Sequence, residues 1–451
     1  MTPNERFHRL LYLTVQRLRG RPLGAYIRRL QEWERLEPEA FQRLRAQRLA
    51  RTLEYARTHI PLYRSGPWQE AFRRSGAGDL RSWPVLEREI IQSSGAALLA
   101  KPTPRGLYYR TSSGSTGQPL RVGADPDGAA WVWANEYRGL LWHGIGVCAR
   151  SLSLRRRGES ALAEWIRNQT TVPTGDLSPR RLDDAVRFLL TRRPTYVWGF
   201  PSAVAELARH ARLTAGGAPR PLVPFAKVFG EMLYPAQRQE IEEGLGTRVI
   251  ETYGCQETGS VAYECPAGSL HIFAEHVEME ILRHGEPAEP GETGDIVLTC
   301  TTNRMMPLIR YRVGDLGRLS PDPCSCGRPH PVMAGIEGRT GELLLTAAGD
   351  RLHGGVLSGV LKKASAKSSP TAIGRVLFEQ HDLQTWTILV QTGPGYDDST
   401  SVILADGVKS IFGQECRVAV KQVVEIPREP FGQAPVLPCH RASLRFPVAR
   451  G

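Results

Sequence analysis

The sequence predicts an α/β protein with a large N-terminal domain, residues 1–337, and a small C-terminal α+β domain, residues 338–451. Three observations indicate this class. Strand-like and helix-like segments alternate between residues 180 and 254, which is typical of a layered α/β domain. A pattern of period two begins near residue 275 and predicts a β-rich, barrel-like part of the large domain. A chain of 451 residues is also too long for one ordinary domain.

Amphipathic helices are predicted for the first 60 residues, where Leu and Ala recur at helical spacing. This segment holds thirteen Arg, no Lys and six Glu, within a chain whose formal net charge is +12. An Arg-rich surface binds nucleic acid or an anionic membrane in some proteins, and in others it is the solvated face of helices. The spacing favours a solvated face, so no nucleic-acid partner is expected.

Helices and strands are predicted in turn along the middle of the chain. Residues 61–105 are rich in Pro and predict irregular structure with one short helix around Leu86 to Ser93. The stretch GAAWVWANEYRGLLWHGIG then predicts a buried, aromatic-rich helix. Strand, turn and helix follow in PTYVWGFPSAVAELA, and the same rhythm returns in AKVFG, AQRQEIEEGLG and RVIETYG. Further strands are predicted in HVEMEILRHG, DIVLTC and LIRYRVGDLGRL.

The small C-terminal domain is predicted to mix short strands with one or two helices. Its expected strands are ELLLT, WTILVQT, SVILAD and CRVAVKQVVEI. Its expected helices run from Leu352 to Lys363 and from Gly407 to Phe412. The tail is rich in Pro and predicts extended chain.

Composition excludes several classes of protein. Hydrophobic residues make up 41% and charged residues 23% of the chain, as in soluble globular proteins. No apolar run approaches the roughly 20 residues needed to span a bilayer, and the N-terminus does not resemble a secretory signal. Eight Cys in a chain of this size do not make a disulfide scaffold. A cytoplasmic location without a membrane span is therefore expected.

The stretch SSGSTG, at residues 112–117, is a candidate phosphate-binding loop. Gly allows the backbone to approach a ligand closely, and consecutive N–H groups form an anion-binding nest. A flexible linker has a similar composition. Here aromatic and β-branched residues flank the stretch at Tyr108, Tyr109 and Val122, so a tight loop between two strands is expected. From this stretch alone, phosphate binding and a plain loop both stay open.

Four further stretches bear on a nucleotide site: VIETYGCQETG, YRVGDLGRL, GRTGE and FGEM. Each is an ordinary turn when taken alone. In their order along the chain, together with LEYARTHIPLYR, SSGSTG and CSCGR, they resemble the adenylate-forming superfamily of acyl-CoA synthetases and adenylation domains. Within it they resemble the phenylacetate-CoA ligase and CapK-like branch, and the resemblance covers most of the chain.

The resemblance implies an ATP-dependent, AMP-forming ligase. Such an enzyme converts a carboxylic acid, here expected to be aromatic or small, into an acyl-adenylate with release of pyrophosphate. It then passes the acyl group to CoA or to an amine. Mg²⁺ offsets the phosphate charge in such a site, and a homodimer is a further expectation. The alternative is a catalytically degenerate homologue that binds nucleotide and acts through a partner protein.

The resemblance also implies a role for each matched residue. Tyr253 would stack on adenine, Asp315 would bind the ribose and Glu257 would hold Mg²⁺. The catalytic residues would be Glu257, Arg339 and Thr116. The residues expected to bind the nucleotide are Ser112, Ser113, Gly114, Ser115, Thr116, Gly117, Glu231, Tyr253, Gly254, Asp315 and Arg339. The acyl substrate would lie among Trp131, Trp133, Tyr137, Trp198, Phe200 and Pro201, which without the resemblance are simply core residues.

Four positions, in three places, depart from the family pattern. Gln433 stands where the family has a lysine that completes the adenylation site, and an amide cannot supply the point charge of an ammonium. Arg428 or Arg441 would be a substitute cation. Gly341 and Glu342 replace an Asp pair at the hinge, and Gln256 replaces the usual Ser or Thr before the Mg²⁺ ligand.

Four residues form a candidate zinc set: Cys265, His271, Cys324 and Cys326. Thiolate and imidazole ligands suit a tetrahedral structural Zn²⁺. The resemblance supports this set, because similar Cys and His positions recur in the phenylacetate-CoA ligase-like group. Free thiols in turns are the alternative, and Cys255 is an alternative ligand.

Overall fold

The computed structural model describes most of the chain. The described residues are 2–75, 79–103, 106–111, 120–155, 158–175, 177–215, 221–339, 343–346, 351–367, 372–424, 426 and 439–442. Several sequence predictions fall outside them, namely the Ser/Gly stretch at residues 112–117 with Thr116, and positions Gly341, Glu342, Arg428 and Gln433.

The chain begins with three helices, as the sequence predicts: α1 (Pro3–Leu18), α2 (Leu23–Trp33) and α3 (Pro38–His59). Thr2 and Glu5 form a capping box at the start of α1, which satisfies backbone N–H groups that have no partner within the helix. The helices α2 and α3 bury apolar residues, α1 buries His8, Tyr12 and Gln16, and most Arg side chains of this segment are exposed. The exposure supports the prediction of a solvated basic face.

The Pro-rich segment holds more helix than the sequence analysis predicted. The helix α4 (Gly66–Ser75) was missed, whereas α5 (Arg88–Ser94) lies close to the predicted position. Pro67 sits in the first turn of α4, where its missing N–H costs no hydrogen bond, so Pro marks a helix start here. Within the described parts of the chain, no helix combines the length and apolar character that crossing a membrane requires.

The strands β1 (Tyr108–Thr111) and β2 (Arg121–Ala124) pair antiparallel and flank the Ser/Gly stretch, as predicted. The long helix α6 (Pro126–Trp142) follows and matches the predicted aromatic-rich helix. The Asp125 side chain accepts the Gly128 N–H and caps its first turn. Most residues of α6 are buried, because helices pack on one side of it and the main sheet on the other.

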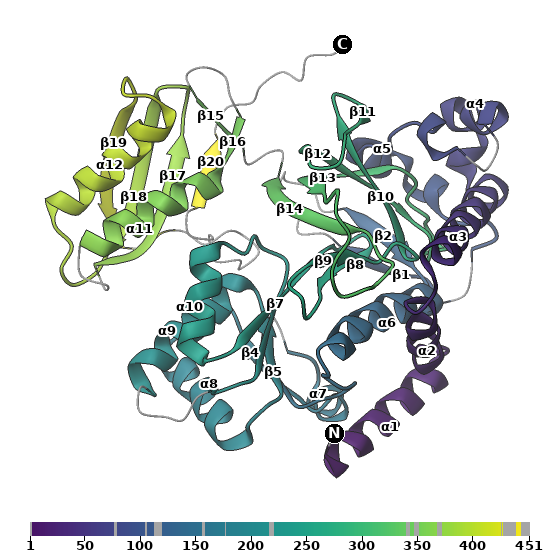
Figure 1. The fold of residues 1–451 in the computed structure, drawn as a ribbon, viewed down its shortest axis with the longest axis horizontal. Helices are drawn as coiled ribbons and strands as arrows, with labels where there is room; N and C mark the ends of the chain where they lie inside the picture. Colours follow the sequence, from purple (N-terminus) through teal and green to yellow (C-terminus); the bar gives the residue numbers. More distant parts are fainter. Residues whose placement is uncertain are drawn as a thin grey trace.

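Twelve strands form one continuous sheet in the order β11-β10-β12-β13-β14-β9-β8-β7-β6-β5-β3-β4 (Figure 1). Five of them form a parallel half: β4 (Gln169–Pro173), β3 (Ser151–Arg155), β5 (Tyr196–Gly199), β6 (Phe225–Val228) and β7 (Arg248–Cys255). The helices that connect them are α7 (Ala161–Ile166), α8 (Pro179–Arg192), α9 (Pro201–Thr214) and α10 (Pro235–Leu245). The predicted alternation of strand and helix is therefore confirmed.

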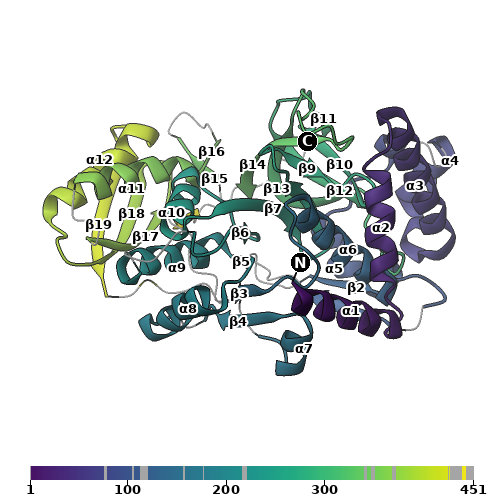
Figure 2. The same ribbon diagram turned by 60° about the horizontal axis from the view of Figure 1, so that its bottom comes forward.

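Each face of the parallel half has its own core. Aliphatic residues of α8, α9 and α10 cover one face (Figure 2). The aromatic-rich helix α6 and the N-terminal helices cover the other. The carboxyl ends of parallel strands are the usual place for a ligand in such a sheet.

The antiparallel half continues the same sheet from β7. Its strands are β8 (Gly259–Glu264), β9 (Leu270–Ile272), β14 (Val332–Arg339), β13 (Tyr311–Leu319), β12 (Gly294–Cys300), β10 (Val277–Arg283) and β11 (Glu286–Pro287). The three strands predicted in this region are confirmed. The β-rich part that the sequence predicts as barrel-like is thus the antiparallel half of the large sheet, in which the described strands pair in a linear order.

The C-terminal part has a sheet of its own, in the order β19-β18-β17-β20 (Figure 1). The elements of this part are β15 (Leu343–Leu345), β16 (Arg351–His353), α11 (Ser358–Lys367), β17 (Ile373–Gln380), β18 (Thr385–Thr392), α12 (Asp398–Phe412), β19 (Arg417–Val423) and β20 (Cys439–Ala442). Its apolar residues form a separate core cluster. The division into domains at residue 338 stays a prediction, and β14 runs across that point.

Two predictions for this part are wrong, and one strand was not predicted. SVILAD was expected to be a strand but lies in α12, whose first turn is capped by Asp397. This short apolar run fits the period of a strand as well as that of a helix. The Asp397 cap before it and the helical residues after it favour the helix. The helix expected from Leu352 begins only at Ser358, because residues 351–353 pair with β15. The strand β17 was missed altogether.

Candidate active site

Tyr253, Asp315 and Arg339 lie together where the two halves of the sheet meet. Tyr253 is on β7, whereas Asp315 and Arg339 are register partners on β13 and β14. The Tyr253 hydroxyl donates to Asp315 Oδ2 over 2.8 Å, and Arg339 Nε lies 3.4 Å from Asp315 Oδ1. Arg339 is half exposed and Asp315 is largely buried. The structure therefore groups three residues that the sequence analysis assigned to the nucleotide.

The backbone after Tyr253 admits only glycine. A Cβ on Gly254 would lie 2.3 Å from the carbonyl oxygen of Gly259 on the neighbouring strand. The β7–β8 register shifts between Tyr253 and Gly254, so the strand bulges at this point. The bulge gives this end of β7 a bend next to the Tyr253 ring.

Glu257 is buried beside Tyr311 and Arg88. Its side chain is only 7% exposed, the Tyr311 hydroxyl donates to Oε1 over 3.2 Å, and Arg88 Nη1 lies 3.8 Å away. Burial raises the pKa of Tyr311, and the negative charge of Glu257 raises it further, so the phenol stays a donor. Tyr311 and Arg88 both approach Oε1, and the lone pairs of Oε2 could bind a metal cation.

Glu231 lies between β6 and α10, and its side chain contacts the first turn of α9. The backbone N–H and the hydroxyl of Ser202 both donate to its carboxylate at 3.1 Å. Burial raises the pKa of Glu231 to about 7, although the two hydrogen bonds oppose that rise.

Two of the predicted acyl contacts, Trp198 and Phe200, form one aromatic wall. Phe229 completes it, with its ring centroid 5.6 Å from Trp198 and 5.4 Å from Phe200. Trp198 ends β5, Phe200 precedes α9, and Pro201 is the first residue of that helix. The wall stands at the carboxyl ends of β5 and β6, where a ligand is expected in a parallel sheet. The sequence analysis missed Phe229 as a site residue, although its FGEM stretch was singled out.

The other predicted acyl contacts point into the protein core. Trp131 stacks on Tyr26 of α2 with ring centroids 4.1 Å apart, and Arg48 lies over its face. Tyr137 packs edge to face on Tyr12 and is also buried, and Trp133 packs against the same core cluster. Their role as acyl contacts stays a prediction, and this packing favours a core role.

A buried ion pair that the sequence analysis did not find lies next to the aromatic wall. Lys227 of β6 donates to Glu136 of α6, and the Ser260 hydroxyl donates to the second oxygen of the same carboxylate over 2.8 Å. The Lys227 ammonium lies 5.3 Å from the Trp198 ring centroid and 5.0 Å from that of Phe229. These contacts connect the helix α6 to both halves of the sheet.

A second buried pair holds α6 from its other side. Arg138 donates to Glu275, and His330 Nε2 lies 3.1 Å from the other carboxylate oxygen, with all three side chains fully buried. Burial opposes ionisation of Glu275, but Arg138 and His330 outweigh it and hold the pKa of this carboxyl well below its usual range. Arg138 also lies over the Phe273 ring, 4.1 Å from its centroid.

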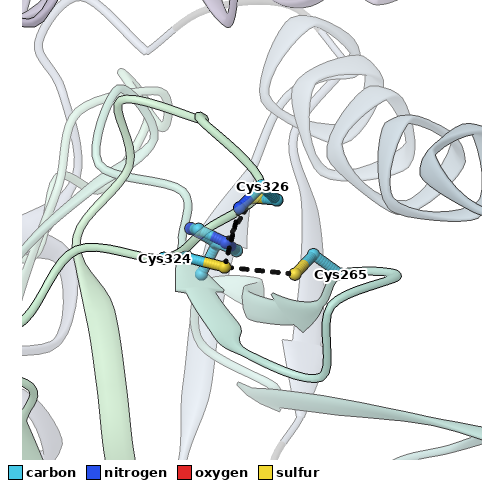
Figure 3. A group of neighbouring side chains, drawn as sticks. Cys265, Cys324 and Cys326 are labelled. Atoms are coloured by element: carbon cyan, nitrogen blue, oxygen red, sulfur yellow. Dashed lines mark hydrogen bonds between the residues drawn. The ribbon is translucent and has the colours of Figure 1, made fainter.

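The predicted zinc residues converge at the end of the antiparallel half (Figure 3). One potential ligand atom from each of Cys265, His271, Cys324 and Cys326 lies within 4.8 Å of the others. Cys265 Sγ and Cys324 Sγ are 3.7 Å apart, and Cys326 Sγ is 3.2 Å from His271 Nε2. His271 Nδ1 is 3.2 Å from the His330 carbonyl, so an N–H there donates and leaves Nε2 as a ligand.

The thiols of this group differ in acidity. Burial raises the pKa of Cys265 to about 11. Burial also opposes ionisation of Cys324, but hydrogen bonds from Ser269 and from Cys326 outweigh it and lower the pKa to about 7. Cys255, the alternative ligand, is not in this group, since its Sγ contacts the Thr258 hydroxyl at 3.2 Å.

The described residues thus offer an aromatic wall at the ends of β5 and β6, the buried carboxylate of Glu257 after β7, and the hydroxyl-accepting carboxylate of Asp315 on β13. Together these groups suit a ligand that has an aromatic base, vicinal hydroxyls and a polyphosphate with its cation. Arg441, one proposed substitute for the missing lysine, lies on β20.

Comparison with known proteins gives close likenesses. The chain is 30% identical over 340 residues to the phenylacetate-coenzyme A ligase of Thermus thermophilus, covering 70% of this chain and 74% of that protein. It is 28% identical over 332 residues to the phenylacetate-coenzyme A ligase of Escherichia coli, covering 68% and 73%. Its fold resembles 2-hydroxyisobutyryl-CoA ligase in complex with 2-HIB-AMP, with a TM-score of 0.72, 20% identity and 89% and 90% coverage. No protein-family model matches the chain.

Proposed function

The chain belongs to the phenylacetate-CoA ligase family, and we propose that it activates a small or aromatic carboxylic acid with ATP and transfers the acyl group to coenzyme A. The observation that carries this proposal is the grouping of Tyr253, Asp315 and Arg339 next to the buried carboxylate of Glu257. A degenerate binding homologue would not need a buried carboxylate that is kept available for a cation.

Each residue has a task in the first half-reaction. Tyr253 would stack on adenine, and Asp315 would accept hydrogen bonds from the ribose hydroxyls in place of the Tyr253 hydroxyl. Arg339 would reach the ribose or the phosphates from the end of β14. Glu257 would hold Mg²⁺, which supplies positive charge against the phosphates and the departing pyrophosphate. The predicted Ser/Gly loop at residues 112–117 would wrap the phosphates, and Glu231 would complete the nucleotide site.

Two bond exchanges make up the reaction. A carboxylate oxygen of the acid attacks the α-phosphorus of ATP, and the bond to pyrophosphate breaks, which leaves an acyl-adenylate. The sulfur of CoA then attacks the acyl carbon, the thiol proton passes to solvent, and AMP leaves with the bonding electrons. The protein contributes position and charge neutralisation rather than covalent chemistry.

We further propose that residues 338–451 form a small mobile domain that serves both half-reactions. Its separate sheet and separate core support this division. A cation from this domain would replace the family lysine, with Arg428 or Arg441 as the candidates. The same proposal includes three further expectations. The enzyme is expected to be cytoplasmic, to form a homodimer and to belong to the CapK-like branch of the family.

The proposal is tested by pyrophosphate release with MgATP and a panel of aryl and aliphatic acids, with CoA, with hydroxylamine or with neither. Release that depends on one acid, with a thioester formed in the presence of CoA, is the expected result. If hydroxylamine yields a hydroxamate but CoA yields no thioester, the acyl acceptor would be an amine instead of CoA. No release with any acid, in protein that binds ATP by calorimetry, would overturn the ligase and leave a nucleotide-binding homologue.

We also propose that Cys265, His271, Cys324 and Cys326 hold a structural Zn²⁺. Three sulfur atoms and one imidazole nitrogen are the donor set that tetrahedral Zn²⁺ prefers, and the group joins the turn after β8 to the loop before β14. No substrate-binding residue belongs to the group, so the ion would hold structure rather than catalyse.

Purified protein is therefore expected to contain about one zinc per chain, measured by inductively coupled plasma mass spectrometry. Cys324→Ser is expected to remove the metal and to lower the melting temperature, because binding energy in such sites is folding energy. Cys416→Ser, which changes a buried thiol of the C-terminal part, is the matched control and should keep the metal. Equal zinc content in Cys324→Ser and the unmodified chain would contradict the proposal.

A further inference from the structure

A row of polar side chains crosses the parallel half of the sheet on the face that α6 covers. Ser153 of β3 is the register partner of Trp198 on β5, and Trp198 is the partner of Lys227 on β6. Register partners on adjacent strands lie side by side on one face. Ser153, Trp198 and Lys227 therefore present a hydroxyl, an indole N–H and an ammonium group to the same space.

This row has hydrogen-bonding capacity that the described residues do not use. The Ser153 hydroxyl is fully buried and has no hydrogen-bond partner among the described residues, and the same holds for the buried Nε1 of Trp198. The Lys227 ammonium is 6% exposed and has three N–H donors, of which Glu136 takes one in the described part of the chain. Buried donors without partners are costly, so a polar partner is expected in this space.

The space borders the site that binds the acid. Ser260, which donates to Glu136, is the register partner of Gly254, the residue that follows Tyr253. The Lys227 ammonium lies over the rings of Trp198 and Phe229, two members of the aromatic wall. The polar row therefore adjoins that wall and shares Trp198 with it, near the carboxyl ends of β5 and β6.

We propose that the acid carries a second polar group, an uncharged hydroxyl or aryl amine, and that Lys227, Glu136 and Trp198 recognise it. This inference rests on the proposed ligase function. Lys227 and Glu136 neutralise each other, so a second carboxylate would be repelled by Glu136 as much as it is attracted by Lys227. A group that both donates and accepts matches the pair, with Glu136 accepting and Lys227 donating.

The expected preference for a hydroxyl- or amino-substituted acid follows from the buried donors that have no partner among the described residues. A site built to hydrogen-bond a substrate hydroxyl rejects the analogue without it by several orders of magnitude, because its buried polar groups then stay unpaired. We therefore expect kcat/KM for the preferred hydroxyl- or amino-substituted acid to exceed that of its methyl-substituted analogue by at least about a hundredfold.

The experiment measures acid-dependent pyrophosphate release for aryl acids in matched sets: unsubstituted, hydroxyl, amino and methyl. The double variant Lys227→Met with Glu136→Gln is expected to reduce the hydroxyl-over-methyl preference to within about tenfold. Trp198→Phe keeps a ring but removes the N–H, and should reduce the preference about tenfold. Arg209→Met with Glu240→Gln removes a surface pair between α9 and α10 and should leave the preference unchanged.

The outcomes separate this inference from the function on which it rests. If no acid supports release, the ligase itself is overturned. If methyl and hydroxyl acids react equally well in the unmodified enzyme, the ligase stands and the inference is overturned. A double variant that folds, binds ATP and keeps the full preference also overturns it, because the pair would then only brace α6 against the sheet.

Discussion

Glu257→Gln is expected to lower acid-dependent pyrophosphate release by at least about a hundredfold. The amide keeps the size of the side chain and can still accept the Tyr311 hydroxyl, so the local fold should persist. It lacks the negative charge that is proposed to hold Mg²⁺, and charge stabilisation of this kind carries barrier lowering on the order of several kcal/mol. The loss should therefore appear in the chemical step rather than in stability.

The measurement is single-turnover pyrophosphate release at saturating acid, accompanied by the melting temperature of each protein. Glu286→Gln makes the same change at an exposed position on β11 and is expected to leave release unaffected. Release by Glu257→Gln within about twofold of the unmodified enzyme would contradict the assignment of Glu257 as the Mg²⁺ ligand, since a lost charge term costs far more.

Arg138→Met is expected to lower the free energy of unfolding by about 3–5 kcal/mol, the second large effect that the structure predicts. The substitution leaves the fully buried Glu275 carboxylate with His330 alone. An uncompensated buried charge is far more costly than a missing surface pair. The pKa of Glu275 is lower in the folded state than in the unfolded chain. The ion pair therefore stabilises the fold fully at pH values above the ordinary pKa of a carboxyl group, and this stabilisation is lost as the pH falls through the lower folded-state pKa.

Urea unfolding at neutral pH, followed by tryptophan fluorescence, measures this effect. Arg57→Met is the matched control, because Arg57 pairs with Glu54 on the exposed side of α3 and its loss should leave the unfolding free energy nearly unchanged. The double variant Arg138→Met with Glu275→Gln should lower the unfolding free energy by less than the sum of the two single variants, since the two residues share one interaction. Equal unfolding free energies for Arg138→Met and Arg57→Met would show that the buried pair does not hold α6 in place.

Most of the fold followed from local signals in the sequence. Helical spacing predicted α1 to α3 and α6, and alternating strand and helix patterns predicted the parallel half of the sheet. Failures occurred where a short apolar run fits two periods, as in SVILAD, which belongs to α12. They also occurred where Pro starts a helix rather than excluding one, as in α4.

The candidate site was predictable where its residues lie in local motifs. Tyr253, Asp315 and Arg339 lie on strands and Glu257 follows one, and they were found because their stretches together resemble the superfamily. The four zinc candidates were also found by residue type, although 59 positions separate Cys265 from Cys324. The sequence could name these groups, but only the pairing of β8, β9 and β14 shows that they meet.

The sequence by itself thus supplied the candidate residues of the nucleotide and zinc sites, because the order of several short motifs along the chain resembles that of a known superfamily. Only the tertiary structure decided which aromatic residues stand in the wall and which fill the core, since both kinds lie on the same buried elements. It alone paired Lys227 with Glu136 and Arg138 with Glu275, across 91 and 137 positions. The physical reason is that such pairs form only when α6 packs on the sheet. The spacing of residues within α6, or within a strand, does not specify how the two pack.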